Sequence, residues 1–271
     1  MNFKKNVFPF LLGTFIGMII FGFGIILKWE NDRKKTDLLT HELKKSISTR
    51  EDKDFISHES FVNPPEDSND IYWDYVKSDY LQVDFDILLE RNEDTVAWLQ
   101  VNGTSIDYPV VQSSDNEYYL THSFDRSFNQ TGWIYSDYRN NFEQIQQNTI
   151  IYGQARSDGS MFGSLKNIVE KTMEQERMNY IIKLSTPKEN MIWQIFSAYT
   201  ISNESDYLTS SFANNDNYQE FLDTITKRSN ILFSTDVDVE DRLLTLATCF
   251  NHSDDQLVIH AKLIKKETIS S

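Results

Sequence analysis

The stretch Leu243-Leu244-Thr245-Leu246-Ala247-Thr248-Cys249 is a run of apolar residues and threonines that ends on the only cysteine of the chain. After a short polar segment, a second run of the same kind follows at 256–264. Short apolar runs bounded by Asn, Asp or Ser are typical of β-strands joined by turns. Working outward from this pair, the sequence predicts further strands at 105–112, 132–135, 148–153, 179–184 and 191–201.

Helices are few in the same region. The sequence predicts one at 161–171 and another at 217–228, where Tyr218, Phe221, Leu222 and Ile225 repeat at helical spacing. Residues 71–91 mix aromatic and acidic residues and are interpreted as helical segments. Many short strands with few long helices favour a closed barrel or a sandwich over a doubly wound parallel sheet. We therefore expect a mainly β domain with flanking helices at 71–271.

An uncharged segment lies near the N-terminus, at 8–27. A helix of this length spans about 30 Å, the thickness of a bilayer core. The segment ends in Leu27-Lys28-Trp29-Glu30, which lacks the small residues of a signal-peptide cleavage site, so an uncleaved signal anchor is expected. Charge leaves its orientation open, since basic residues flank both ends: Lys4, Lys5, Lys28, Arg33, Lys34 and Lys35.

The segment between this anchor and the predicted domain, at 28–70, is expected to be a stalk and a linker. Leu38, Leu39, Leu43 and Ile47 lie at roughly helical spacing, which favours an amphipathic stalk. From 51 to 69 the composition is polar and contains Pro64-Pro65, which is typical of a linker.

Composition excludes several classes of function. The formal net charge of −15 disfavours nucleic-acid binding, because phosphate backbones are repelled by an acidic surface. Five scattered histidines and one cysteine give no metal-binding pattern, and no cofactor is expected. Asp115, Asp125 and Asp137 are interpreted as part of a solvated acidic face rather than as calcium ligands. A lone cysteine is either a small buried apolar residue or a reactive thiol.

Four stretches together resemble the class B sortases. The first runs from Asp84-Phe85-Asp86-Ile87-Leu88 to Tyr108-Pro109-Val110-Val111, and the second from Asp115-Asn116-Glu117-Tyr118-Tyr119-Leu120 to Arg139-Asn140. The third is Asn148-Thr149-Ile150-Ile151-Tyr152-Gly153-Gln154 with Asp158-Gly159-Ser160-Met161-Phe162-Gly163. The fourth is Thr245-Leu246-Ala247-Thr248-Cys249 with Val258-Ile259-His260-Ala261-Lys262-Leu263.

The resemblance implies an eight-stranded β-barrel, with the helix at 217–228 between the sixth and seventh strands. It also implies a domain outside the cell beside the wall, and hence a single-pass membrane protein with residues 1–7 in the cytoplasm. Such enzymes cleave a sorting signal of a surface protein or pilin, hold it as a cysteine thioester and transfer it to an amine of peptidoglycan or of another pilin. Their catalytic residues are a cysteine, a histidine and an arginine.

Only the cysteine is found in this chain. Cys249 matches the nucleophile, whereas Gln154 stands at the histidine position and Gln256 at the arginine position. A glutamine amide neither accepts a proton usefully near neutral pH nor holds a thiolate by charge. An unassisted thiol has a pKa of roughly 8.5, so about 3% is thiolate at pH 7. Loss of a general acid–base costs about 10²–10⁴ in rate, and loss of an oxyanion donor about 10²–10³.

Substitutes for the missing groups are weak. His252, three residues after Cys249, is a candidate base, although a loop histidine is more often solvated. Arg156 follows Gln154 by two residues and is interpreted as a solvated loop residue. His122 and His260 are interpreted as structural, and Arg242 is expected on the face opposite Cys249.

Two functions therefore stay open. The first is a cysteine transpeptidase with impaired or atypical chemistry, completed by a rearranged base or by a partner. The second is a degenerate pseudo-sortase that binds a sorting signal, a pilin or an active sortase as an assembly factor.

Overall fold

The computed structural model describes residues 3–46, 78–169, 180–202, 204–231, 235–249 and 255–269. The predicted linker at 51–69, the predicted domain start near Ile71 and His252 lie outside these ranges. By its internal contacts the chain divides into two compact units, Met1–His41 and Glu42–Ser271.

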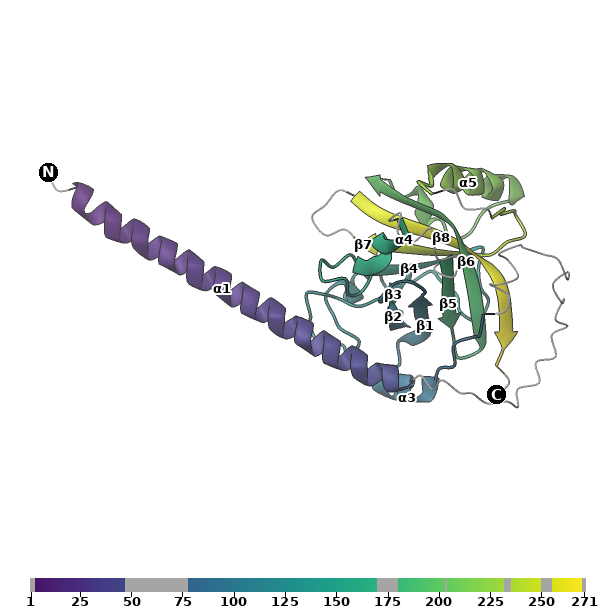
Figure 1. Ribbon diagram of the computed structural model, residues 1–271, viewed down its shortest axis with the longest axis horizontal. Helices are drawn as coiled ribbons and strands as arrows, with labels where there is room; N and C mark the ends of the chain where they lie inside the picture. The colour runs from purple at the N-terminus through teal and green to yellow at the C-terminus, as the bar shows by residue number, and fades with distance from the viewer. Residues whose placement is uncertain are drawn as a thin grey trace. The chain divides into compact units, whose positions relative to one another are not determined.

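The described part of the N-terminal unit is helical and belongs to α1, Phe3–Leu43 (purple in Figure 1). The last two residues of α1, Glu42 and Leu43, are assigned to the second unit. Its stretch from Leu12 onward is long and apolar enough to cross a membrane, a test that signal sequences near an N-terminus also meet. The residues expected to form the anchor and the start of the stalk therefore share one helix.

The second unit is an eight-stranded closed barrel, which confirms the expected fold (Figure 1). Neighbouring strands follow the order β1-β2-β3-β4-β7-β8-β6-β5. Two neighbouring pairs are parallel, β2 with β3 and β4 with β7. The strands are β1 Thr95–Val101, β2 Asp107–Val111, β3 Tyr135–Ser136, β4 Asn148–Gln154, β5 Ile181–Ser185, β6 Glu189–Ser202, β7 Leu243–Cys249 and β8 Asp255–Thr268.

Short helices and turns connect these strands. Among its described residues, the α-helices are α3 Phe85–Arg91, α4 Lys166–Val169 and α5 Asn215–Arg228. The 3₁₀ turns are η1 Lys44–Ser46, η2 Tyr118–Leu120, η3 Gly163–Leu165 and η6 Asp206–Leu208. α5 begins where the side chain of Asn214 accepts a hydrogen bond from the backbone N–H of Asn217, at 2.9 Å, and it lies between β6 and β7 as expected.

The predicted strand at 132–135 is mostly wrong. Only Tyr135 of that stretch belongs to a strand, because Gly132 has a φ of +58° and turns the chain. A Cβ at position 132 would lie 2.6 Å from the carbonyl oxygen of Leu120, so the backbone passes too close for any other residue. The turn places the indole N–H of Trp133 where it donates to the carbonyl of Pro109, at 2.9 Å.

The predicted helix at 161–171 is shorter in the structure. Met161 has a φ of +51° and pairs with Ala155 in an isolated bridge, so the helix cannot begin there. The chain instead makes η3 and then α4, and 170–171 lie outside the described residues.

Helix α5 packs against β6 and β8. The hydroxyl of Ser197 in β6 donates to the carbonyl of Ile225 in α5, at 2.6 Å. The ring of Phe221 meets the ring of His260 in β8 edge-on, with centroids 6.1 Å apart. Side chains alternate along a strand, so the face of β8 that α5 covers also carries Val258 and Gln256.

Candidate functional site

Two of the predicted site residues are neighbours across a strand pair. Gln154 is the last residue of β4 and Cys249 the last residue of β7. The parallel register pairs Gln154 with Cys249 at the end of the ladder. The side chain of Cys249 lies outside the described part of the structure, so its place is known from the backbone.

The third predicted position lies on the other side of Cys249. β7 and β8 are antiparallel, and their register pairs Ala247 with Val258. One residue on, the hydroxyl of Thr248 accepts from the backbone N–H of Leu257, at 2.9 Å. The printed backbone pairing ends before Cys249 and Gln256, which lie near the adjoining ends of β7 and β8. Three positions that are far apart in the sequence therefore lie on the neighbouring strands β4, β7 and β8.

Gln154 is buried, with 7% of its surface exposed. Its side-chain N–H donates to the carbonyl of Leu120 in η2, at 2.9 Å. This bond ties the end of β4 to the segment that precedes the Gly132 turn. One face of the site is therefore formed by a loop between β2 and β3.

Gln256 is also buried, with 5% exposed, and its partner is a residue that sequence reasoning missed. The hydroxyl of Tyr207 donates to the side-chain oxygen of Gln256. Tyr207 belongs to η6 and is 1% exposed, although it directly follows the polar stretch Ser202-Asn203-Glu204-Ser205-Asp206. The sequence contained one signal of this burial: Tyr207 is an aromatic residue beside a polar stretch, and a tyrosine ring that packs into a core usually gives its hydroxyl a hydrogen-bond partner.

The segment around η6 is held by side chains from other elements. Arg228 of α5 donates to both carboxylate oxygens of Asp206, at 2.7 and 2.8 Å, and to Glu204 at 2.5 Å. Arg139 donates to the carbonyl of Leu208 at 3.1 Å. The side-chain N–H of Asn148 in β4 donates to the carbonyl of Thr209 at 2.9 Å. These bonds fix the segment on both sides of Tyr207.

His260 is structural, as expected. It is fully buried, with its Nε2 at 2.9 Å from the hydroxyl of Tyr199 and its Nδ1 at 2.9 Å from the hydroxyl of Thr245. Thr245 in turn donates to the side-chain oxygen of Asn148, at 2.7 Å, so its oxygen accepts from Nδ1–H. Burial, helped by the charge of Arg228, lowers the pKa of His260 to about 3. The ring is therefore neutral at physiological pH.

Asp137 was expected on a solvated acidic face, and that expectation is wrong. Its side chain is fully buried and forms an ion pair with Arg139, with a closest approach of 2.8 Å. The hydroxyl of Tyr152 donates to the same carboxylate at 2.8 Å. Burial alone would raise the pKa of Asp137, but the bonds from Arg139, Tyr152 and Asn116 outweigh it and hold the pKa below its usual value. Asp137 thus fixes Arg139, which holds Leu208.

Arg156 is not the solvated residue that was expected. Its guanidinium is paired with Asp158, at 2.7 Å, and only 7% of its side chain is exposed. It lines a cavity of about 280 Å³ together with Thr248, Thr200 and Leu257. Thr248 and Leu257 are each one residue from the row of Gln154, Cys249 and Gln256, and neighbouring strand residues face opposite sides. Arg156 is therefore on the other face of these strands.

His122 is structural, as expected. Its ring stacks on that of Tyr118, with centroids 4.1 Å apart, and its Nδ1 lies 2.8 Å from the carbonyl of Tyr118. His252, the candidate substitute base, lies outside the described residues.

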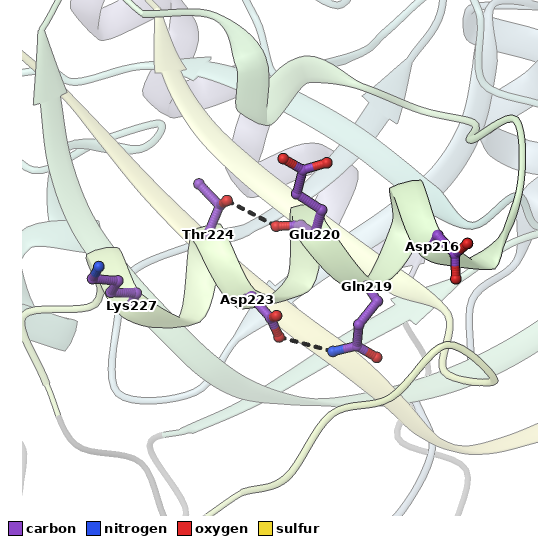
Figure 2. A pocket seen from close by; sticks show the side chains of 6 residues that line it. All are labelled: Asp216, Gln219, Glu220, Asp223, Thr224 and Lys227. Carbon is purple, nitrogen blue, oxygen red and sulfur yellow. Dashed lines mark hydrogen bonds between the residues drawn. The ribbon is translucent and has the colours of Figure 1, made fainter.

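A second hollow, about 390 Å³, lies along the solvent face of α5 (Figure 2). Two of its side chains are bonded within the helix: Gln219 donates to Asp223 at 2.8 Å, and Thr224 donates to the carbonyl of Glu220 at 2.8 Å. The hollow is shallow, acidic and formed by one helix, and it holds none of the predicted site residues: its lining is Asp216, Gln219, Glu220, Asp223, Thr224 and Lys227.

Comparisons with known proteins agree with this geometry. The sortase domain family matches residues 99–264. Sortase B of Staphylococcus aureus is 33% identical over 190 residues, which are 69% of this chain and 77% of that protein. A solved S. aureus sortase B–substrate complex is 34% identical, with a TM-score of 0.63 over 67% of this chain and 84% of that one.

A longer structural match extends the agreement. Sortase B from B. anthracis, solved in complex with AAEK1, has a TM-score of 0.69 and is 27% identical, over 89% of this chain and 99% of that one. The barrel, the strand register around Cys249 and these similarities lead to one conclusion: the chain belongs to the sortase family, and within it to class B.

Proposed function

We propose that the chain is a sorting-signal transpeptidase in which Cys249 is the nucleophile and two neutral glutamines flank it. The observation that carries the proposal is the strand register that pairs Gln154 with Cys249, with Gln256 on the adjoining strand β8 in support.

The proposed reaction has two steps. The sulfur of Cys249 attacks the carbonyl carbon of the scissile peptide bond, the C–N bond breaks and the amine leaves with a proton. The resulting thioester is then attacked by an acceptor amine of peptidoglycan or of a pilin, which forms a new amide and returns the proton to the thiol. Both steps pass through a tetrahedral intermediate with a negatively charged oxygen.

Gln256 is suited to stabilise that oxygen without a charge. Its own oxygen accepts from Tyr207, so its amide N–H₂ is the group that donates to the substrate. Gln154 supplies no base, so the proton must pass to His252, to a partner or to water. We therefore expect the chemistry to be slow at neutral pH.

A second candidate function is favoured by the same two amides. Both are buried, and both are bonded to protein groups: Gln154 to Leu120 and Gln256 to Tyr207. Such a site is fit to hold an extended peptide through neutral hydrogen bonds without cleaving it. In that case the chain is a pseudo-sortase that presents sorting signals or pilins to an active sortase.

We further propose that α1 anchors the chain in the cell membrane in a single pass. The apolar stretch of α1 supports a span. The relation to sortases supports a cytoplasmic N-terminus, a stalk and linker up to about residue 70 and a barrel domain outside the cell. Acceptors of the cell wall are then within reach of the barrel.

The experiment that separates the two functions uses the full chain in detergent micelles, mixed with peptides that each contain a central Thr–Gly bond. Intact-mass spectrometry detects a thioester as the added mass of the N-terminal peptide fragment. We expect a slow adduct on the natural chain, no adduct on Cys249→Ala and a faster adduct on the double variant Gln154→His with Gln256→Arg.

Two other outcomes are informative. An adduct that persists in Cys249→Ala would sink the proposal of a Cys249 nucleophile. An adduct that forms only on the double variant would assign the natural chain to the second function, because the groove then accepts the peptide and only the chemistry is missing.

A further inference from the structure

We propose that Tyr207 is a positioning residue that sets the orientation of the Gln256 amide and so makes it a donor to the substrate carbonyl. The inference rests on the proposed function. It concerns a residue that lies far from Cys249 in the sequence and that acts through Gln256 rather than by touching the reacting atoms.

The chemistry of the side-chain amide is the first step. A glutamine amide ends in an oxygen, which accepts, and in an N–H₂ group, which donates, and rotation by half a turn exchanges them. An arginine has only donors, so its orientation at this position matters less. When a glutamine takes the place of an arginine, its orientation decides whether the site offers the substrate oxygen a donor or a repelling oxygen.

The second step is the bond that the amide oxygen of Gln256 makes in the structure. The hydroxyl of Tyr207 donates to the oxygen of Gln256, and both side chains are buried, with 1% and 5% exposed. A buried amide oxygen that lost this donor would be left without compensation, which costs about 1–3 kcal/mol. In this arrangement the oxygen of Gln256 faces the hydroxyl of Tyr207, and the N–H₂ group is the one left to serve a second partner.

The third step is that Tyr207 itself is fixed. Asp206, the preceding residue, is held by two hydrogen bonds from Arg228, and the carbonyl of Leu208, the following residue, accepts from Arg139. The adjoining Thr209 is held by Asn148 of β4. A donor that is positioned before the substrate arrives costs no reorganisation during the reaction, and this is what an oxyanion-stabilising group requires.

The test is a double-mutant cycle between Tyr207→Phe and Gln256→Ala in the full chain, read from the rate of thioester formation with a Thr–Gly peptide. Phenylalanine keeps the buried ring and removes only the donor. In the natural background we expect Tyr207→Phe to slow the reaction about fivefold, the worth of one hydrogen bond. In the Gln256→Ala background we expect a change of less than about twofold, since there is no amide left to orient.

The effect should fall on kcat rather than on KM, because the amide N–H₂ bonds most strongly to the oxygen when it carries the negative charge of the intermediate. Tyr218→Phe is the matched control: Tyr218 is equally buried, and its hydroxyl donates to the carbonyls of Asp241, at 2.8 Å, and Gln147, at 3.2 Å. This variant loses a similar bond without touching Gln256, so its rate should stay within about twofold of the natural chain.

Equal slowing by Tyr207→Phe with and without Gln256, or no slowing at all, overturns the inference while the nucleophile proposal stands. If the natural chain forms no thioester, the transpeptidase proposal fails on its own. The affinity of the peptide for the chain is then measured for the same variants. If the loss of affinity in the double variant is smaller than the sum of the losses from Tyr207→Phe and Gln256→Ala, the inference is supported; if it equals that sum, the inference is overturned.

Discussion

The side chains of Gln154 and Gln256 end in neutral amides, which donate and accept hydrogen bonds but do not titrate. The two amides are oriented by different partners, one by a backbone carbonyl of η2 and the other by the hydroxyl of Tyr207. Neither glutamine lowers the pKa of a neighbouring thiol as a cation would. At the residue scale, the two buried amides are therefore organised for hydrogen bonding.

Restoring an ionisable ring at position 154 tests this view. We expect Gln154→His to speed the reaction of Cys249 with a methanethiosulfonate reagent at about pH 7 by about tenfold, because an imidazolium beside a thiol favours the thiolate. The pH dependence of the rate, followed by intact mass, gives the apparent pKa of the thiol. Gln154→Asn is the uncharged control, and an equal acceleration in that variant would mean that access rather than ionisation limits the reaction.

The buried His260 predicts a dependence of stability on pH. Its pKa is about 3 in the folded chain and about 6.5 in the unfolded chain, so the unfolded state takes up the proton first. The stability that comes from the neutral ring is complete above about pH 6.5 and is lost as the pH falls toward 3. Between about pH 7.5 and 5.5 we expect this group to remove about 1.4 kcal/mol from the free energy of unfolding.

Urea unfolding of the full chain in micelles, followed by tryptophan fluorescence at the two pH values, measures this loss. His260→Gln keeps a hydrogen-bonding side chain and cannot titrate, so its stability should change less over the same interval. A variant whose loss matches that of the natural chain would show that other groups cause the dependence.

Among the elements, β4 and β7 carry Gln154 and Cys249, and β4 is tightly packed beside Gln154. Gly153 precedes Gln154, and a Cβ added there would lie 2.7 Å from the ring of Phe162. Phe162 is itself 1% exposed and lies in the turn before η3. The close approach of β4 to this turn thus depends on glycine, which has no side chain, at position 153.

We therefore expect Gly153→Ala to destabilise the barrel by about 1–3 kcal/mol, the usual cost of overpacking. The free energy of unfolding in urea measures it. Combining Gly153→Ala with Phe162→Leu should cost less than the sum of the two single changes, since the smaller side chain makes room for the new methyl group. Additive costs would show that the strain arises elsewhere.

Most elements could be predicted from the sequence, and the failures have local causes. β1 was missed as a strand because five of its seven residues are buried, which hides the alternation that marks a strand. β8 runs four residues past its predicted end, where Lys266 pairs with Glu189 of β6 at 2.6 Å, so that polar residues continue the ladder. Strand 132–135 failed because of the turn at Gly132.

Only those residues of the candidate site that belong to the family motifs could be predicted from the sequence. Gln154, Cys249 and Gln256 were placed by resemblance, and their adjacency follows from a strand order that no local pattern gives. Tyr207 and its supports, Arg228 and Arg139, come from separate parts of the chain and meet only in the folded structure. Their roles depend on which atoms pair, and single-residue patterns do not carry that information.

At the scale of the whole molecule, the chain combines an apolar helix with an acidic barrel domain. Residues 1–35 carry six basic and two acidic residues, so the part beyond residue 35, with 20 basic and 39 acidic residues, has a balance of −19. An acidic domain is repelled by anionic lipid headgroups.

The proposed topology predicts which residues a membrane-impermeant maleimide can reach. In a Cys249→Ala background, Gln219→Cys on the exposed face of α5 should be labelled on intact cells. The matched variant Asn2→Cys should be labelled only after the cells are permeabilised. Mass shifts of the purified protein measure both, and the reverse pattern would require a cytoplasmic barrel.

The parallel pairing of β4 with β7 also determines when the site can exist. A protein is synthesised from its N-terminus, so about ninety residues follow β4 before β7 is made. Only then can β7 pair with β4 on one side and with β8 on the other. Contacts between residues so distant in sequence form late, because a long loop must close first. While β7 is still unpaired, the chain therefore carries Gln154 at the end of β4 without Cys249 beside it. The two positions become neighbours only once β7 has joined the sheet, so the site forms among the last parts of the barrel.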